Sequence, residues 1–210
     1  MVGESHPRAP ARYEILPSLI LAFHGTDAGT AEKVLSGKEH LTQSRNEYDW
    51  LGHGIYFWEH SPRRAYEFAQ QSTREPRLTK GKVVKPAVIG AIIDPGLCLN
   101  LLEASALARV KEAYEVLNLI ESPLPKNIGG ADRGGRKLDC AVVEMVHRLR
   151  EPGTGALSQM APSLQPYDTV RGAFWEGEEL YPGAGFMEKN HVQICVRNPD
   201  CIKGYFRVIP

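Results

Sequence analysis

Hydrophobic residues along the chain fall into two spacings, one typical of strands and one typical of helices. Three stretches rich in apolar residues predict strands: residues 13–23 (YEILPSLILAF), 86–93 (PAVIGAII) and 191–196 (HVQICV). Shorter runs that also favour strands occupy residues 52–57, 97–101, 167–173 and 204–209. These runs predict a protein with several short strands.

Helical spacing appears between these runs. Residues 103–119 place Leu107, Val110, Ala113, Tyr114 and Leu117 on one apolar stripe. Further helices are predicted over 27–36, with an Asp or Thr N-cap and a Gly C-cap signal, from Ser61-Pro62 onward, and over 138–149. Strands mixed with helices in this order indicate the α+β class.

The domain organisation is predicted to be simple. Residues 1–12 are polar, carry two prolines and indicate a flexible N-terminal tail. Residues 13–210 have the length of a single domain, with a helical insertion around 103–166. Whether that insertion binds a partner or belongs to the core stays open at this level.

Charge and cysteine content narrow the setting. The chain holds 25 basic and 25 acidic residues, so no overall field attracts nucleic acid or a membrane. Residues 15–23 are too few to span a bilayer and lack an export signal, which favours a cytoplasmic protein with no membrane partner. The four cysteines form no Cys-x-x-Cys pair, so we expect reduced thiols and no metal site.

Candidate chemistry gathers in residues 22–69, where two glycine-flanked polar motifs occur. The first is Phe-His-Gly-Thr at 23–26 and the second is Gly-His-Gly-Ile-Tyr-Phe at 52–57. A glycine after His24 lets the backbone approach a ligand that the imidazole can hydrogen-bond. Tyr56 adds an aromatic ring beside a backbone with little side-chain bulk. Together the motifs suit a flat, polar cofactor.

These motifs, followed by a Ser-containing helix start and an alanine at position 65, resemble the ADP-ribosyltransferase superfamily. The resemblance is to the branch shared by diphtheria-type toxins and poly(ADP-ribose) polymerases, which carries a His–Tyr–Glu triad. A weaker match covers residues 190–202 (NHVQICVRNPDCI), which are similar to the family's Asn-Glu-Tyr-x-Val-Tyr segment.

The resemblance implies a fold and a cofactor site. NAD would lie as co-substrate in a cleft between two small sheets, with no metal. His24 would contact the ribose next to nicotinamide, Gly25 would hold the carboxamide through its backbone, and Tyr56 would stack on the nicotinamide ring. The other cofactor-binding positions implied are Thr26, Gly54, Phe57, Ser61 and Tyr66.

The third catalytic position has two candidates. No glutamate stands on the strand that matches the family's catalytic segment, and the register of its apolar residues favours Gln193 there. Glu188, just before that strand, could reach in from the loop. An amide can hydrogen-bond a ribose hydroxyl, whereas only a carboxylate supplies charge to an oxocarbenium-like ribose.

The implied activity is an enzymatic transfer of ADP-ribose from NAD to a macromolecule, which could be protein, RNA or DNA. Loop 171–190 stands where the family carries its target-recognition loop, and its interleaved aromatic residues suit a target contact. By analogy with the family, such a protein would be a toxin held by an inhibitory antitoxin, or a phage-defence effector. The alternatives are an NAD glycohydrolase, an NAD-dependent RNA phosphotransferase, and an inactive NAD-, ADP-ribose- or protein-binding module.

Overall fold

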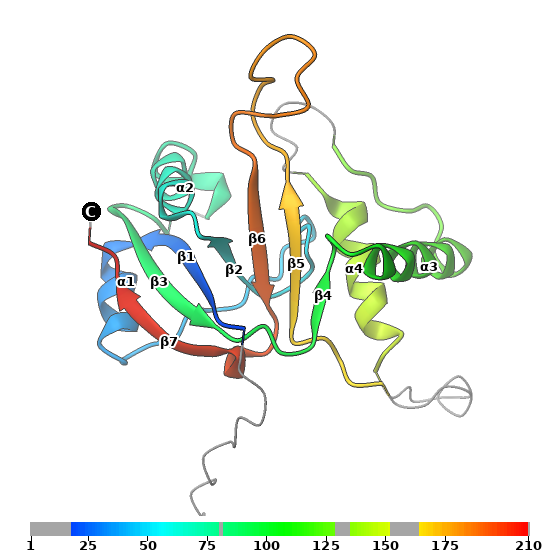
Figure 1. Cartoon of the computed structure of the whole chain (residues 1–210), viewed down its shortest axis with the longest axis horizontal. Helices are drawn as coiled ribbons and strands as arrows, with labels where there is room; N and C mark the ends of the chain where they lie inside the picture. Colours follow the sequence, from blue (N-terminus) through cyan, green and yellow to red (C-terminus); the bar gives the residue numbers. More distant parts are fainter. Residues whose placement is uncertain (1–17, 80–81, 129–134, 152–163, 210) are drawn as a thin grey trace, which may run out of the picture.

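Seven strands form the centre of the molecule. The computed structural model describes residues 18–79, 82–128, 135–151 and 164–209; the predicted tail 1–12 and the start of the first predicted strand lie outside these ranges. The strands are β1 (Ile20–Asp27), β2 (Ile55–Glu59), β3 (Pro86–Ile93), β4 (Cys98–Asn100), β5 (Thr169–Phe174), β6 (His191–Val196) and β7 (Ile202–Arg207). They make one sheet in the order β4-β5-β6-β2-β1-β3-β7, in which only the β4–β5 pair is parallel (Figure 1).

The described residues also contain four helices. They are α1 (Ala28–Leu35), α2 (Pro62–Arg74), α3 (Ala104–Ile120) and α4 (Lys137–Arg148). Asp27 caps α1, because its side chain accepts a hydrogen bond from the amide of Gly29 at 2.8 Å. Pro62 begins α2, where a missing amide proton costs nothing. Within the described ranges, no helix has the length and apolar character needed to cross a membrane.

Strands and helices of this kind agree with the predicted α+β class. Strands β3 and β6 have the predicted bounds, and the predicted helices are confirmed to within one residue at the starts of α1, α3 and α4. Strand β1 differs, since it continues to Asp27, beyond the end of the predicted run 13–23. The reason is pairing with β3, which runs as far as Asp27↔Pro86 and holds the whole His-Gly-Thr motif in extended conformation.

Strands β1 and β2 share fewer residue pairs than any other two neighbouring strands of the sheet. Only two residue pairs join them, Ala22↔Glu59 and Phe23↔Trp58, whereas eight pairs join β1 to β3. Beyond Phe23, strand β1 therefore has a paired neighbour on one side only. The finer expectation of two separate small sheets stays a prediction.

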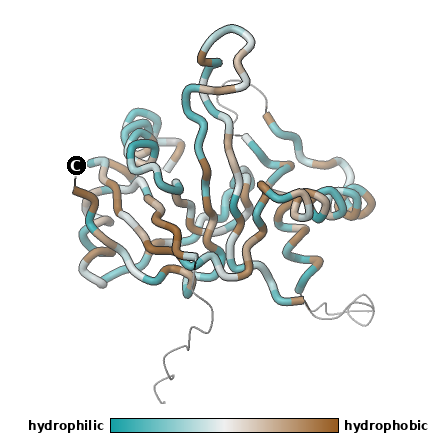
Figure 2. Tube along the Cα trace, in the orientation of Figure 1, coloured by the Kyte–Doolittle hydropathy of each residue, from teal (hydrophilic) through white to brown (hydrophobic). Residues whose placement is uncertain are grey.

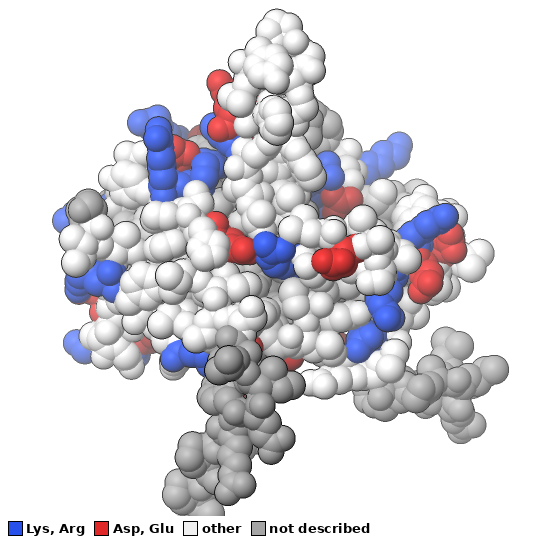
Figure 3. All heavy atoms as spheres, in the orientation of Figure 1, with Lys and Arg blue, Asp and Glu red and all other residues white. Residues whose placement is uncertain are grey.

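Two buried clusters cover opposite faces of the sheet. One joins α1 to the central strands through residues such as Val34, Phe57 and Ile194. The other joins α3 and α4 to β4, β5 and β6, so these helices share a core with the sheet. Figure 2 places hydrophobic residues mainly along the strands and leaves α2 largely hydrophilic. On the face shown in Figure 3, acidic and basic side chains are interspersed rather than grouped by sign.

Helix α2 lies on the same face as α3 and α4. Side chains alternate along a strand, so Gly25, which meets α2, and Ala22, which belongs to the α1 cluster, point to opposite faces of β1. On β2, Trp58 contacts Phe68 of α2, and Tyr56 packs with the α3–α4 cluster. The surface between α2 and the α3–α4 pair is therefore floored by β2, β6 and β5.

Candidate functional site

The structure brings the two sequence motifs side by side. The Nδ1 atom of His24 on β1 donates a hydrogen bond to the backbone oxygen of Tyr56 on β2, at 2.7 Å. The His24 ring also lies 5.6 Å from the ring of Phe57. Residues 32 positions apart in the sequence thus meet at the point where β1 and β2 stop pairing.

Burial and this hydrogen bond together determine the protonation state and the tautomer of His24. Burial lowers the pKa of the imidazole, an effect that the hydrogen bond to Tyr56 only partly opposes. The ring is therefore neutral at pH 7, with its proton on Nδ1 and Nε2 left as an acceptor. In the described part of the chain Nε2 makes no hydrogen bond, and the residue is half-buried. It can accept a hydrogen bond from a ligand hydroxyl.

Tyr56 has a structural task that the sequence did not reveal. Its hydroxyl donates to the oxygen of Gly52 at 2.8 Å and accepts from the amide of Leu51 at 2.9 Å. Burial raises the pKa of the phenol well above its ordinary value, so the hydroxyl stays protonated. The side chain holds the loop that leads into β2, and its hydroxyl is not free for a ligand.

Gly25 and Gly54 are explained by packing. A Cβ on Gly25 would stand 2.0 Å from the backbone oxygen of Ala65 in α2, and a Cβ on Gly54 would stand 2.5 Å from the Sγ of Cys195. The backbone N–H and carbonyl oxygen of Gly54 are both hydrogen-bonded to the backbone of Ser44. No space exists over Gly25 on its side-chain face for a ligand group.

The other residues implied by the resemblance are dispersed. Thr26 is buried on β1, and Phe57 is fully buried in the α1 cluster, where it has no surface to offer a cofactor. Ser61 stands at the N-cap of α2 without a side-chain capping bond. Tyr66 is 43% exposed on α2. Of these four, Ser61 and Tyr66 have the exposure that a ligand contact needs.

Of the two candidates for the third catalytic residue, Gln193 lies on the strand beside β2. It pairs with Trp58, two residues along the strands from the pair Tyr56↔Cys195, so Gln193 and Tyr56 are diagonal neighbours on one face. Its Oε1 accepts a hydrogen bond from Nε1 of Trp50 at 2.7 Å.

Glu188 lies elsewhere. It is exposed in the loop between β5 and β6, which projects from the sheet in Figure 1, and its contacts are with Glu178 of the same loop.

His24, Tyr56 and Gln193 do not converge on one face of the sheet. Because Phe23 pairs with Trp58 and side chains alternate, His24 shares its face with Phe57, whereas Gln193 shares the opposite face with Tyr56. The expected triad is joined through the backbone of Tyr56. A ligand touching both His24 and Gln193 would have to pass over the unpaired edge beyond Phe23.

An aromatic cluster around Gln193 was not predicted as a site. The Trp58 ring lies 6.1 Å from the ring of His191, which lies 5.7 Å from Phe174, and Phe174 lies 5.0 Å from Trp50. Nε1 of Trp58 and Nε2 of His191 are buried without a hydrogen-bond partner. The signal available in the sequence was the spacing of aromatic and polar residues at alternate positions on β2 and β6.

Ion pairs tie α2 to the loop after β5. Arg64 binds Oε2 of Glu67 at 2.7 Å and Oε2 of Glu176 at 2.8 Å. Glu67, the neighbour of Tyr66 on α2, therefore serves this ion-pair network. Glu176 also lies 4.0 Å from Nδ1 of His191, which burial keeps at a lowered pKa.

Metal and thiol chemistry have no support in the described residues. No group of three or more His, Cys, Asp or Glu side chains there could hold a metal ion. All four cysteines are free thiols, and burial raises the pKa of Cys140 and of Cys201 to about 11. Such thiols stay protonated and are poor nucleophiles.

Comparisons with known proteins give one relative of undescribed activity. The chain is 25% identical over 188 residues to the uncharacterized protein MJ0359 of Methanocaldococcus jannaschii, a match that covers 86% of this chain and 83% of that protein. No protein-family model matches the chain, and no solved structure does.

Proposed function

We propose that this protein binds NAD beside His24 and transfers ADP-ribose to a macromolecular acceptor in the cytoplasm. The observation that carries the proposal is the hydrogen bond from His24 Nδ1 to the Tyr56 backbone, which orients a neutral Nε2 acceptor at the end of the β1–β2 junction. The motifs that make this contact are those that resemble the ADP-ribosyltransferase superfamily. The two-pair junction also supports a sheet divided between β1 and β2.

The chemistry asked of these residues is modest. Cleavage of the bond to nicotinamide passes through a ribose of oxocarbenium character, as in glycoside hydrolysis. His24 Nε2 would accept a hydrogen bond from a ribose hydroxyl and fix the orientation of the sugar. Because Gln193 lies on the opposite face from His24, it would contact only a part of the ligand that passes over the unpaired edge beyond Phe23. Its NH₂ group could donate to a hydroxyl there, and its oxygen could accept if Trp50 released it.

A first experiment incubates the protein with NAD labelled in its adenylate part and with separate pools of protein, RNA and DNA. It measures two quantities, the rate of nicotinamide release and the label transferred to each pool. We expect label in one pool, and loss of at least 100-fold in rate for His24→Ala. His40→Ala is the matched control, because His40 is exposed and makes no hydrogen bond or ion pair within the described residues. Equal rates for the two variants would refute the proposal.

A second experiment identifies the third residue. Gln193→Ala should lower the rate and Glu188→Ala should leave it unchanged, since only Gln193 lies beside β2. Gln193→Glu should raise the rate of nicotinamide release, because a carboxylate stabilises the developing positive charge. A rate lowered by Glu188→Ala alone would assign the role to the loop.

A second function is favoured by one observation. Gln193, the residue that the resemblance assigns to the position of the family's glutamate, is a neutral amide bonded to Trp50, which suits a module that binds NAD or ADP-ribose without turnover. Saturable NAD binding that His24→Ala abolishes, with no nicotinamide release, would establish it. Nicotinamide release with no labelled macromolecule would instead indicate an NAD glycohydrolase.

The biological setting extends the same proposal. By analogy with the family that the motifs resemble, we propose that the chain is a toxin or phage-defence effector held in check by an antitoxin protein. Its removal should make expression of the wild-type chain toxic and leave expression of His24→Ala harmless.

A further inference from the structure

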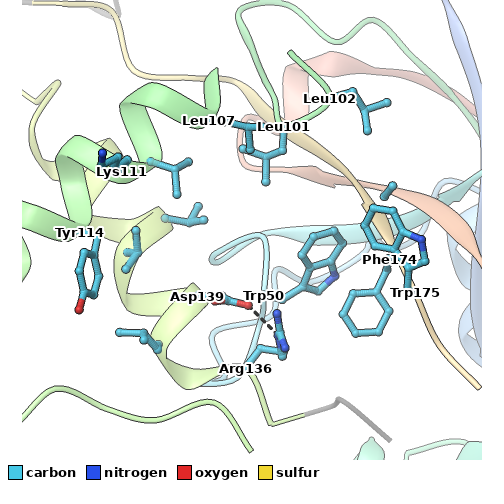
Figure 4. A pocket seen from close by; sticks show the side chains of 15 residues that line it. Trp50, Leu101, Leu102, Leu107, Lys111, Tyr114, Arg136, Asp139, Phe174 and Trp175 are labelled. Carbon is cyan, nitrogen blue, oxygen red and sulfur yellow. Dashed lines mark hydrogen bonds and ion pairs between the residues drawn. The ribbon is translucent and has the colours of Figure 1, made fainter. Parts of the chain in front are cut away.

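A hollow of about 660 Å³ opens on the α3–α4 side of the sheet (Figure 4). This volume lies within the range of sites that bind small organic molecules. Trp50, Phe174 and Trp175 stand together on one side of it, and apolar residues of α3 and α4 form the other. The site is separate from His24, because none of its lining residues belongs to β1 or β2.

The apolar residues of α3 form two neighbouring stripes instead of the single predicted one, and the second of them faces this hollow. Ala106, Ala113 and Leu117 are buried in the cluster shared with α4. The positions Leu107, Val110, Lys111 and Tyr114 follow helical spacing on a neighbouring stripe and line the hollow. Leu107 is 52% exposed, and Trp175, on the other side of the hollow, is 47% exposed. Apolar surface left open on both sides of a hollow is a mark of a binding site.

The charges of the hollow favour an anion. Arg136 donates from Nε to Oδ2 of Asp139 at 2.6 Å, and Asn127 donates to Oδ1 of the same carboxylate, so the pair is neutral as a whole. Lys111 at the rim has no ion pair with any described carboxylate. One positive charge therefore stands at the rim without a direct ion pair, beside the apolar walls.

We propose that this hollow binds a small organic anion with a flat, apolar ring system, of the aromatic monocarboxylate class. The ring would lie among Trp50, Phe174 and Trp175, where aromatic contacts add to the burial of apolar area. The carboxylate would remain near the rim and pair with Lys111. The inference does not depend on the proposed NAD chemistry.

Trp50 connects the hollow to strand β6. The Trp50 ring lines the hollow, while its Nε1 holds Oε1 of Gln193 at 2.7 Å. A ligand against the ring therefore touches the residue that fixes the Gln193 amide. The chain has three tryptophans, and two of them line the hollow, so binding should change the tryptophan emission.

Calorimetric titration of the full-length protein tests the site, with 2-naphthoate as probe and 2-naphthalenemethanol as its neutral counterpart. We expect 2-naphthoate to bind several-fold more tightly than the alcohol. Lys111→Glu should weaken 2-naphthoate roughly tenfold, because an attraction at the rim becomes a repulsion. Arg109→Glu is the matched control: it makes the same charge change on α3, at an exposed residue that does not line the hollow.

A second pair of variants tests the apolar wall. Leu107→Asp should abolish binding of both probes, whereas Leu119→Asp, on the same helix but away from the hollow and 84% exposed, should not. Three results would overturn the proposal. They are no binding of either probe, equal affinities in Lys111→Glu and Arg109→Glu, or a dimer in solution that Leu107→Asp dissociates, which would make the hollow a contact between two copies of the chain.

Discussion

Replacement of Gly25 by alanine separates a packing role from a ligand-binding role at the centre of the site. The added Cβ would lie 2.0 Å from the backbone oxygen of Ala65 and 3.3 Å from the Cβ of Ala69. A normal contact needs at least about 1 Å more, and the obstacle is a helix backbone held by two fully buried alanines. Overpacking of this kind costs about 1–3 kcal/mol, and a rigid obstacle favours the upper end, near 3 kcal/mol.

Urea denaturation followed by circular dichroism measures this loss. In a thermal denaturation experiment, a loss of about 3 kcal/mol in a protein of 210 residues would appear as a decrease of roughly 6–12 °C in Tm. Gly204→Ala is the control, because a Cβ there meets no atom within 4 Å, and it should leave stability unchanged or slightly raised. A free energy of unfolding for Gly25→Ala within about 0.5 kcal/mol of the wild type would refute the packing argument. It would return Gly25 to a role in ligand approach alone.

Three further predictions follow from the surroundings of β2 and α4. Tyr56→Phe should lower the free energy of unfolding by about 1–2 kcal/mol in urea denaturation, because the amide and carbonyl that the hydroxyl bonds would lose a partner. Trp50→Phe and Gln193→Leu should show a coupling of about 1 kcal/mol in a double-mutant cycle, whereas additive losses would mean that their hydrogen bond contributes nothing. Burial lowers the pKa of His147 from 6.5 to about 4, so on acidification the unfolded chain takes up this proton before the folded chain does. The free energy of unfolding should therefore fall by up to about 3 kcal/mol as the pH drops from 6.5 to 4. Urea denaturation across this pH range should show a smaller decline for His147→Leu.

Local sequence pattern determined most of the elements. The continuous apolar run at β3 and the alternating run at β6 predicted those strands residue for residue, because each is bounded by polar and turn-forming positions. Ser61-Pro62 likewise predicted the start of α2. The extension of β1 from Gly25 to Asp27 could not be predicted in this way, since glycine and aspartate are depleted in strands and the extended segment follows from pairing with β3.

Long-range contacts account for what the sequence did not reveal about the site. The bond between Trp50 and Gln193 joins residues 143 positions apart, and that between Arg64 and Glu176 joins residues 112 apart. No local pattern announces such pairs. The sequence pointed to His24 through its glycine and its resemblance to a family, but it could not show that a backbone oxygen orients the imidazole.

The balance of charge near β6 bears on whether the site turns NAD over. Glu176 is a carboxylate that the structure does bring against this strand, 4.0 Å from Nδ1 of His191. Its charge is already shared with Arg64 at 2.8 Å and with Lys189 at 4.0 Å, so it adds little net negative potential. Gln193 contributes none. In the proposed function, a site so arranged would bind a ribose through neutral hydrogen bonds, whereas fast cleavage would require a carboxylate freed from Arg64 or supplied by the acceptor. The rate of nicotinamide release with and without acceptor therefore decides between transferase and binding module more directly than any further feature of the fold.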